Sequence, residues 1–240
     1  MGRLVLVRHG QARAFTEDPD RLSETGWEQC RILGRYWKEH DIQFDLAFHG
    51  TLRRQRESYE AVADAYGGNE DDFPAARVLH GLDEYQAQDV IAEIAPRLAA
   101  TDASFAPLWQ AWLDGRHAAD RNRPFQRMFE AVMERWVEGK MREPGLEPWQ
   151  QFRERVEETL AQLRATPGRG MRLVAFTSGG PIGVALQSCL GAPARAALDI
   201  NWRVRNSSLA SFLFHGSRLS LDGFNETPHL ASSPELVTFR

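Results

Sequence analysis

The run LVLVRHG at residues 4–10 decides how this sequence is interpreted. Its apolar residues predict a buried strand that stops at Arg8 and His9, after which Gly10 lets the backbone turn. In open α/β sheets, ligands bind just outside the carboxyl ends of the strands, where this cation and imidazole would lie. An arginine beside a potentially nucleophilic histidine suits an anionic substrate, most simply a phosphate. The alternative is a strand that ends in a polar turn, with His9 an ordinary surface histidine.

The composition is that of an ordinary soluble globular protein. The 240 residues, 42% of them apolar and 26% charged, allow one large domain or one domain with a big insertion. A net charge of −4 argues against a general nucleic-acid surface. The N-terminal apolar run is too short to be a signal peptide or to span a membrane. We therefore expect a cytoplasmic protein without nucleic-acid or membrane partners.

Short apolar runs alternate with helical patterns along most of the chain. This alternation predicts an α/β fold, a three-layer α/β/α sandwich with a mainly parallel sheet covered on both faces. The last two runs read as a hairpin through His215-Gly216-Ser217. Residues 236–239 are a candidate edge strand that could pair two copies of the chain as a homodimer. The predicted strands are 3–7, 45–48, 77–79, 172–176, 208–214 and 218–221.

The segment from about 86 to 149 departs from this alternation of apolar runs and helical patterns. It carries four of the seven tryptophans, and the apolar residues from Phe125 to Trp136 repeat at helical spacing. We interpret residues 1–240 as a single domain in which 86–149 forms a helical insertion after the third strand.

The turns that follow the first four strands gather the polar residues of interest. If the strands are parallel, these turns share one edge of the sheet and bring together cationic groups, an imidazole, a carboxyl pair and a glycine-rich helix start. Pro181 suits the first helical position, so the backbone N–H groups around Gly179 and Gly180 would face the same edge and could dock an anion. Together the turns favour a phosphate-handling site over chance surface polarity. They are Arg8-His9-Gly10, residues 49–54, residues 81–84 and residues 177–181.

These residues resemble the histidine phosphatase superfamily, which includes the cofactor-dependent phosphoglycerate mutases. The signature Leu6-Val7-Arg8-His9-Gly10 is the most specific part of the resemblance. The other motifs are looser, but they follow in the family's order along most of the chain. They are residues 22–29 at the start of the first helix, 51–54, 82–84 and 224–230.

The resemblance implies a mechanism that the residues also permit. His9 would attack phosphorus and form a phosphohistidine that water then hydrolyses, which requires a neutral imidazole with one free nitrogen. Arg8 and Arg54 would hold the phosphoryl oxygens and offset the charge of the transition state. Glu84 would protonate the leaving oxygen, with Asp83 as the competing candidate.

The chain departs from the family pattern after the fourth strand. The family usually has a second histidine there, and this chain has Ser178, whose hydroxyl can donate one hydrogen bond but carries no positive charge. By analogy with oxyanion-hole deletions, the loss could cost roughly 2–4 kcal/mol in the transition state, which weighs most heavily against a mutase. His49, just past the second strand, could partly replace the missing imidazole. Gln11 is a second departure, close to the signature.

Three functions follow from these observations. The first is a metal-independent phosphomonoesterase that acts on a small phosphorylated substrate and needs no cofactor. The second is a phosphate-binding module with little or no catalysis, which Ser178 favours. The third is a serine hydrolase that uses Ser178, although a nucleophile elbow needs glycine where this chain has Phe176. The proposed site contains His9 and Glu84 as catalytic residues and Arg8, Arg54, Ser178 and Gly179 as phosphate-binding residues, with Gln11, His49 and Asp83 as further candidates.

Overall fold

The computed structural model describes residues 1–13, 16–68, 72–86, 94–141 and 146–239. The described chain divides into two compact units, Met1–Glu84 with Arg155–Arg240 and Tyr85–Glu154. Among the described helices, none is both long enough and apolar enough to cross a membrane.

The first unit is built on a six-stranded sheet in the order β3-β2-β4-β1-β5-β6. The first four of these strands are mutually parallel, and β5 and β6 add an antiparallel edge. The predicted mainly parallel sheet is therefore confirmed, as is the hairpin. The strands are β1 (Gly2–Arg8), β2 (Leu46–His49), β3 (Ala76–Val78), β4 (Arg172–Thr177), β5 (Leu209–His215) and β6 (Arg218–Glu226).

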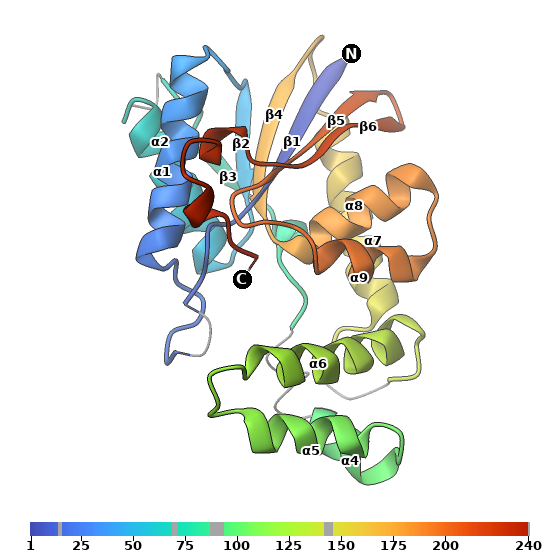
Figure 1. The fold of residues 1–240 in the computed structure, drawn as a ribbon. Coiled ribbons are helices and arrows are strands. Elements are labelled where there is room, and N and C mark those ends of the chain that lie inside the picture. The colour runs from blue at the N-terminus through green and yellow to red at the C-terminus, as the bar shows by residue number, and fades with distance from the viewer. Residues whose placement is uncertain (14–15, 69–71, 87–93, 142–145, 240) are drawn as a thin grey trace. The chain divides into compact units, whose positions relative to one another are not determined.

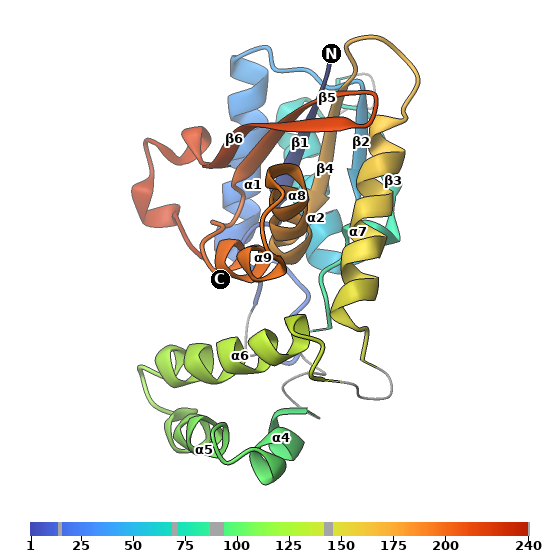
Figure 2. The ribbon, with the colours of Figure 1, turned by 90° about the vertical axis from the view of Figure 1, so that its right-hand side faces the viewer.

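Helices cover both faces of this sheet, which confirms the α/β sandwich. Figures 1 and 2 show α1 and α2 against one face and α7 and α8 against the other. The core under α1 and α2 contains Trp37 and Val62 from the helices and Val7, Val174 and Phe176 from the strands. The helices of this unit are α1 (Glu24–Glu39), α2 (Arg53–Tyr66), α7 (Trp149–Arg164, divided between the units), α8 (Gly179–Leu190) and α9 (Ala194–Asn201), with short 3₁₀ turns η1 (His80–Leu82), η3 (Pro228–Leu230) and η4 (Pro234–Leu236).

The register of the sheet brings the functional turns to one edge. Arg8 at the end of β1 lies opposite Thr177 at the end of β4, and His49 at the end of β2 lies opposite Phe176. His9 then donates its backbone N–H to the Thr177 carbonyl at 2.9 Å, which extends the pairing one residue beyond β1. The turns after β1, β2 and β4 therefore start from the same level of the sheet.

Helix α1 is attached to the first of these turns. Ser23 caps the helix by accepting a hydrogen bond from the Gly26 N–H at 3.1 Å. A Cβ on Gly10 would lie 2.4 Å from the Gly26 carbonyl oxygen, and a Cβ on Gly26 would lie 2.1 Å from the Gln11 carbonyl oxygen. Both positions therefore exclude a side chain, and the backbone after His9 rests directly on the first turn of α1.

The described residues of the second unit form three further helices and the first turns of α7. The amphipathic helix predicted through Phe125 and Trp136 is present as α6. Trp136 is buried, with its ring centroid 5.1 Å from that of Tyr85, 5.2 Å from that of Trp149 and 5.7 Å from that of Phe152. These rings form an aromatic core within the unit. The helices are α4 (Ala95–Thr101), α5 (Ala106–Gly115) and α6 (Asn122–Val137).

The prediction of an edge strand at residues 236–239 is wrong. Pro234 begins the 3₁₀ turn η4, and the described residues that follow form no strand. The backbone carbonyls of Leu236 and Thr238 instead accept hydrogen bonds from the Gln29 side chain at 2.6 Å and from the Asn206 N–H at 2.8 Å. The tail is bound within its own chain by these groups, so the pairing edge that motivated a homodimer is absent from this segment.

Candidate functional site

His9 follows β1 directly, and its hydrogen bonds determine which nitrogen carries the proton. The side chain is buried, with Nδ1 2.7 Å from the carbonyl oxygen of Gly10 and Nε2 3.2 Å from Nε of Arg54. A carbonyl oxygen only accepts and a guanidinium only donates, so Nδ1 carries the proton and Nε2 presents its lone pair. This is the neutral tautomer that a nucleophilic Nε2 requires.

The charges around His9 favour the same state. Burial lowers the pKa of His9 well below its ordinary value of 6.5, and the positive charges of Arg54 and Arg8 lower it further. The hydrogen bond to the Gly10 carbonyl acts in the opposite direction but is the smallest contribution. His9 is therefore neutral at physiological pH.

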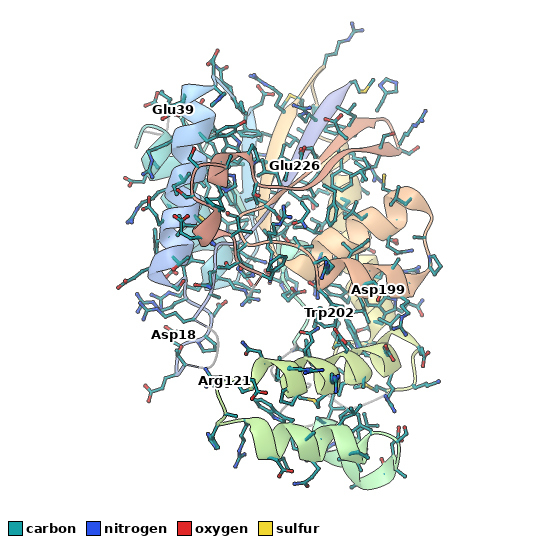
Figure 3. All side chains as sticks on the ribbon, in the orientation of Figure 1. Asp18, Glu39, Arg121, Asp199, Trp202 and Glu226 are labelled. Carbon is teal, nitrogen blue, oxygen red and sulfur yellow. The ribbon has the colours of Figure 1, made fainter. Side chains whose placement is uncertain are left out.

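Arg54 lies in the first turn of α2, where its guanidinium contacts both an imidazole and a carboxylate. Its Nη1 is 2.5 Å from Oδ1 of Asp20, while the other oxygen of Asp20 accepts the N–H of Arg53 at 2.7 Å. Asp18, in the loop from β1 to α1 (Figure 3), pairs with Arg53 at 3.1 Å. Two carboxylates of this loop thus hold the start of α2, and Asp20 orients Arg54 toward His9.

Arg8, the last residue of β1, is held by main-chain carbonyls. Its Nη1 donates to the carbonyl of Val204, ahead of β5, and to that of Phe239 at 3.0 Å. Two segments of the C-terminal part of the chain therefore position the arginine of the signature.

The side-chain carboxylate of Glu84 contacts the N-terminus of α8. Both of its carboxylate oxygens are 3.1 Å from the N–H of Gly180, which donates to them. The N-terminus of a helix attracts a carboxylate, so this contact orients Glu84 toward the start of α8. At Gly179 a Cβ would lie 2.0 Å from Oδ1 of Asn201, so the position has no room for a side chain. The glycine-rich helix start predicted from the sequence thus contacts the carboxylate predicted as the acid.

Ser178 precedes this helix start and is fully buried. Its Oγ accepts a hydrogen bond from Nε2 of Gln55 at 2.8 Å, and Gln55 is the residue next to Arg54. Although Ser178 stands at the N-cap position of α8, its side chain makes no capping bond. Gln55 was missed by the sequence analysis, because nothing in its spacing distinguishes it from the basic residues around it.

Asp83 supports the turn after β2. Its Oδ1 accepts the N–H of Thr51 at 2.5 Å, and its Oδ2 accepts the Thr51 hydroxyl at 2.5 Å and lies 2.8 Å from Nδ1 of His80. Both oxygens of this buried carboxylate thus hold the turn after β2, whereas those of Glu84 accept the N–H of Gly180 at the start of α8.

The two remaining candidates contact other parts of the structure. His49 is buried with Nδ1 2.6 Å from the Gly50 carbonyl oxygen, and its ring centroid lies 5.7 Å from that of Tyr59. Gln11 donates its N–H to Gln29 and accepts the Ser23 hydroxyl, each at 2.8 Å, so it connects the signature to α1. None of the contacts described for these two side chains is with His9, Arg54 or Glu84.

Two residues ahead of β5 hold the peptide of His9 and were not predicted. The side-chain amide of Asn206 and the N–H of Ser207 each donate to the His9 carbonyl oxygen at 3.3 Å. Ser207 has a left-handed backbone with φ of 55°, and its hydroxyl lies 2.9 Å from Nε2 of His229. Because β5 is antiparallel to β1, its start meets the end of β1, and this topology is the signal that could have identified both residues.

Within the described parts of the chain, no group of three or more histidine, cysteine, aspartate or glutamate residues could hold a metal ion. Among the described residues, Arg54 and Arg8 are the charged groups that lower the pKa of His9.

Comparison with known proteins identifies the family. The model of the histidine phosphatase superfamily (branch 1) matches residues 4–139 and 113–227. A 2,3-bisphosphoglycerate-dependent phosphoglycerate mutase of Bradyrhizobium sp. is 39% identical over 71 residues, which are 27% of this chain and 34% of that protein. A protein of the same name from Lactobacillus acidophilus is 43% identical over 60 residues, which are 22% of this chain and 26% of that protein. The match therefore spans about a third or less of the length of these relatives.

Solved structures share the fold over nearly the whole chain. A mutant phosphoserine phosphatase of Entamoeba histolytica in complex with phosphoserine has a TM-score of 0.60 at 15% identity, covering 96% of this chain and 100% of that one. A phosphoglycerate mutase of Bacillus anthracis has a TM-score of 0.64 at 16% identity, covering 96% and 95%. A mycobacterial glucosyl-3-phosphoglycerate phosphatase has a TM-score of 0.61 at 20% identity, covering 94% and 99%. With the family model matching most of its length, the chain belongs to the histidine phosphatase superfamily.

Proposed function

We propose that this chain is a phosphomonoesterase that acts on a small phosphorylated substrate through a phosphohistidine at His9, without a metal ion or cofactor. The observation that carries the proposal is the protonation state of His9: Nδ1–H is bound to the Gly10 carbonyl, and Nε2 faces Arg54. We take residues 1–240 as one domain of the family, with the helical segment at about 86–149 as its insertion.

In the first step, His9 Nε2 attacks the phosphorus of a phosphate monoester. The Arg54 N–H that is bound to Nε2 in the free protein has to transfer to a phosphoryl oxygen, which frees the lone pair for attack. The N–P bond forms as the P–O bond to the leaving group breaks, and Glu84 gives a proton to the departing oxygen. The Gly180 N–H favours the ionised carboxylate, whereas a phosphoryl dianion beside it favours the protonated form, so substrate binding prepares Glu84 to act as an acid.

In the second step, water hydrolyses the phosphohistidine. Glu84, now ionised, takes a proton from the water as its oxygen attacks phosphorus, and the N–P bond breaks to return neutral His9 and inorganic phosphate. Arg8 and Arg54 offset the charge on the phosphoryl oxygens in both steps. Because their positive charges also lower the pKa of His9, they keep the nucleophile neutral before attack.

Hydrolysis is favoured here over mutase activity. The relatives that match in sequence are named phosphoglycerate mutases, while solved structures of the same fold include phosphatases. A mutase must retain and reposition a phosphorylated intermediate. Ser178, in the place of the family's second histidine, supplies one neutral donor and no charge, which weakens retention more than it weakens hydrolysis.

A phosphate-binding module with little catalysis is the second candidate, and Ser178 is the observation that favours it. The module would use the same Arg8, Arg54 and α8 start to bind a phosphorylated ligand. It predicts that phosphate raises the melting temperature while hydrolysis stays at background.

The test is hydrolysis of p-nitrophenyl phosphate in EDTA, from acid to neutral pH, by wild type and by the His9→Ala variant. We expect turnover in wild type and a loss on the order of 10³-fold or more in the variant, since the nucleophile is removed. Acid quench of the wild-type reaction with a labelled phosphate ester should trap label on His9. Equal background rates in both proteins would contradict the phosphomonoesterase and favour the phosphate-binding module. Melting temperatures measured over a series of inorganic phosphate concentrations would then test that module.

A further inference from the structure

Gln55 is a buried polar side chain for which the proposed reaction has no role so far. It lies in the first turn of α2, one residue after Arg54, and is fully buried. Its amide nitrogen donates two hydrogen bonds of 2.8 Å, one to the Leu82 carbonyl and one to the Ser178 hydroxyl. The side chain thus joins α2 to the two turns that precede Glu84 and Gly179.

The orientation of this amide follows from its partners. The Leu82 carbonyl can only accept, and it also accepts the Thr177 hydroxyl at 2.6 Å, so the nitrogen of Gln55 has to face it. The reverse orientation would place two acceptor oxygens against each other. Gln55 therefore donates to Ser178, and the Ser178 oxygen is an acceptor in that contact.

This contact directs the hydroxyl proton of Ser178. A hydroxyl has one proton and two acceptor lone pairs, and the Gln55 N–H occupies one of the lone pairs. The proton consequently points away from Gln55. The other lone pair is not used to cap α8, since Ser178 makes no side-chain capping bond.

The position of Gln55 is costly for a side chain with only a structural purpose. Its Oε1 is buried and accepts no hydrogen bond from the residues that the structure describes. A Cβ at Gly50 would lie 2.0 Å from this oxygen, so the turn after β2 has to lack a side chain for Gln55 to fit. A buried acceptor without a partner costs free energy, so this position of Gln55 is one that the fold has to accommodate.

We infer that Gln55 is a positioning residue that fixes Ser178 as a neutral, single-proton donor to the phosphoryl group. The inference rests on the proposed function and extends it. His9 and Ser178 follow the ends of adjacent strands, joined by the His9 N–H to Thr177 carbonyl bond, and Arg54 and Gln55 are consecutive in α2. Arg54 thus contacts His9, and Gln55, the next residue of the helix, contacts Ser178.

The experiment is a double-mutant cycle between Gln55→Leu and Ser178→Ala. Leucine keeps the volume of Gln55 and removes the donor, and alanine removes the hydroxyl. Because both changes act through one hydrogen bond to the phosphoryl group, we expect each to reduce kcat/KM and the affinity for inorganic phosphate by about 10- to 100-fold. The kcat/KM and the phosphate affinity of the double variant should lie within a factor of about three of those of the less active single variant.

Gln187→Leu is the matched control. Gln187 is also buried, its Nε2 donates to the Ala192 carbonyl at 2.7 Å, and its Oε1 also lacks a described partner, but it lies near the far end of α8. We expect this variant to lower the melting temperature to a similar extent and to leave kcat/KM and phosphate affinity unchanged.

The outcomes separate this inference from the proposed function. If Gln55→Leu behaves like Gln187→Leu, or if its effect multiplies with that of Ser178→Ala, the inference is wrong even where turnover depends on His9. If turnover is absent but the two variants lose phosphate affinity equally and without multiplying, the inference stands and the proposed phosphatase activity does not. Phosphate affinity by calorimetry decides the inference in either case.

Discussion

A histidine followed by a glycine comes directly after β1 and at the end of β2, yet the two turns have different surroundings. In each, the histidine is buried and its Nδ1 lies 2.6–2.7 Å from the carbonyl oxygen of the glycine, so Nδ1 carries a proton in both rings. The other nitrogen of His9 faces Arg54, whereas the ring of His49 packs against Tyr59. The histidine-glycine turn places a proton on Nδ1 of both rings. The residues of α2 that lie beside each ring determine whether the ring meets a cation, Arg54, or an aromatic side chain, Tyr59.

The supports of the two turns also differ. The carbonyl of His9 accepts hydrogen bonds from Asn206 and Ser207, which precede the antiparallel strand β5. The turn after His49 is held by Asp83, through the backbone and hydroxyl of Thr51. A substitution that breaks the support of the His9 turn should therefore affect the reaction. A substitution that breaks the support of the His49 turn should mainly affect the stability of the fold.

The largest difference is expected between the adjacent carboxyls. Glu84→Gln should lower kcat for esters with poor leaving groups by about 10²- to 10⁴-fold, since the proton donor is lost, and should affect p-nitrophenyl phosphate less. Asp83→Asn should instead destabilise the fold by about 1–3 kcal/mol, because Thr51 loses a charged acceptor. Steady-state kinetics with aryl and alkyl phosphates, together with urea unfolding, check both; a larger kcat loss in Asp83→Asn would reverse the assignment.

The partners of the two imidazoles provide the next test. Arg54→Gln should reduce kcat/KM by about 10²- to 10³-fold, as expected for removal of a charged donor to the transition state. Tyr59→Leu, at the ring that contacts His49, should lower the free energy of unfolding by about 1–3 kcal/mol and leave kcat within a factor of about three. If both variants lost activity to the same degree, the distinction between the turns would not hold.

A third buried histidine connects pH to the support of the His9 turn. Burial lowers the pKa of His229 to about 4 from 6.5, and His229 contacts the hydroxyl of Ser207. His229 is thus neutral in the folded protein, while the unfolded chain takes up a proton as the pH falls below 6.5. Its contribution to stability is present above pH 6.5 and is lost as the pH falls toward 4, by about 3 kcal/mol in total.

Urea unfolding at about pH 7 and about pH 4.5 measures this loss. His9 acts in the same direction, because its pKa is also lowered. The His229→Gln variant should therefore retain part of the pH dependence but show a smaller slope than wild type. Parallel stability curves for the two proteins would contradict the assigned role of His229.

The smallest effect is expected at the tail. The hydroxyl of Thr238 accepts from Gln29 and donates to Asn206, each at 2.9 Å, and Asn206 binds the His9 carbonyl. Thr238→Val should cost about 1 kcal/mol of stability and reduce kcat/KM by a few-fold. Thr101→Val is a control, because that hydroxyl caps only the carbonyls of its own helix α4. Equal kinetic effects in the two variants would exclude a role for the tail at His9.

The sequence predicted the parts of the fold that depend on local pattern. The strands β1 and β4 were predicted almost to their ends, because their apolar runs stop abruptly at polar or glycine residues. β6 was expected to end at Leu221 but continues to Glu226, since its last residues are half-exposed at the edge of the sheet and carry no apolar run. The sequence predicts a strand in the tail, and the prediction is wrong because the tail is bound by Gln29, a side chain about 200 residues away in the sequence.

The candidate site likewise contains residues that local motifs predicted and residues whose roles depend on distant contacts. The turn-forming motifs placed His9, Arg54 and the α8 start at one edge from strand order alone. The roles of Gln55 and Asn206 could not be predicted, since each acts through contacts that exist only after distant turns meet. The assignment of Asp83 and Glu84 to different tasks likewise required the positions of Thr51 and Gly180.

The contact between Gly10 and Gly26 has a consequence for how such a protein can change. Each glycine leaves room for a carbonyl that belongs to the other's segment, so a methyl group at either position would displace the backbone that carries His9. The two positions therefore depend on each other, and a single substitution at either one can only distort the turn after β1. Random mutagenesis aimed at a new substrate should consequently yield improved variants among the side chains around this turn, and none at either of the two glycines.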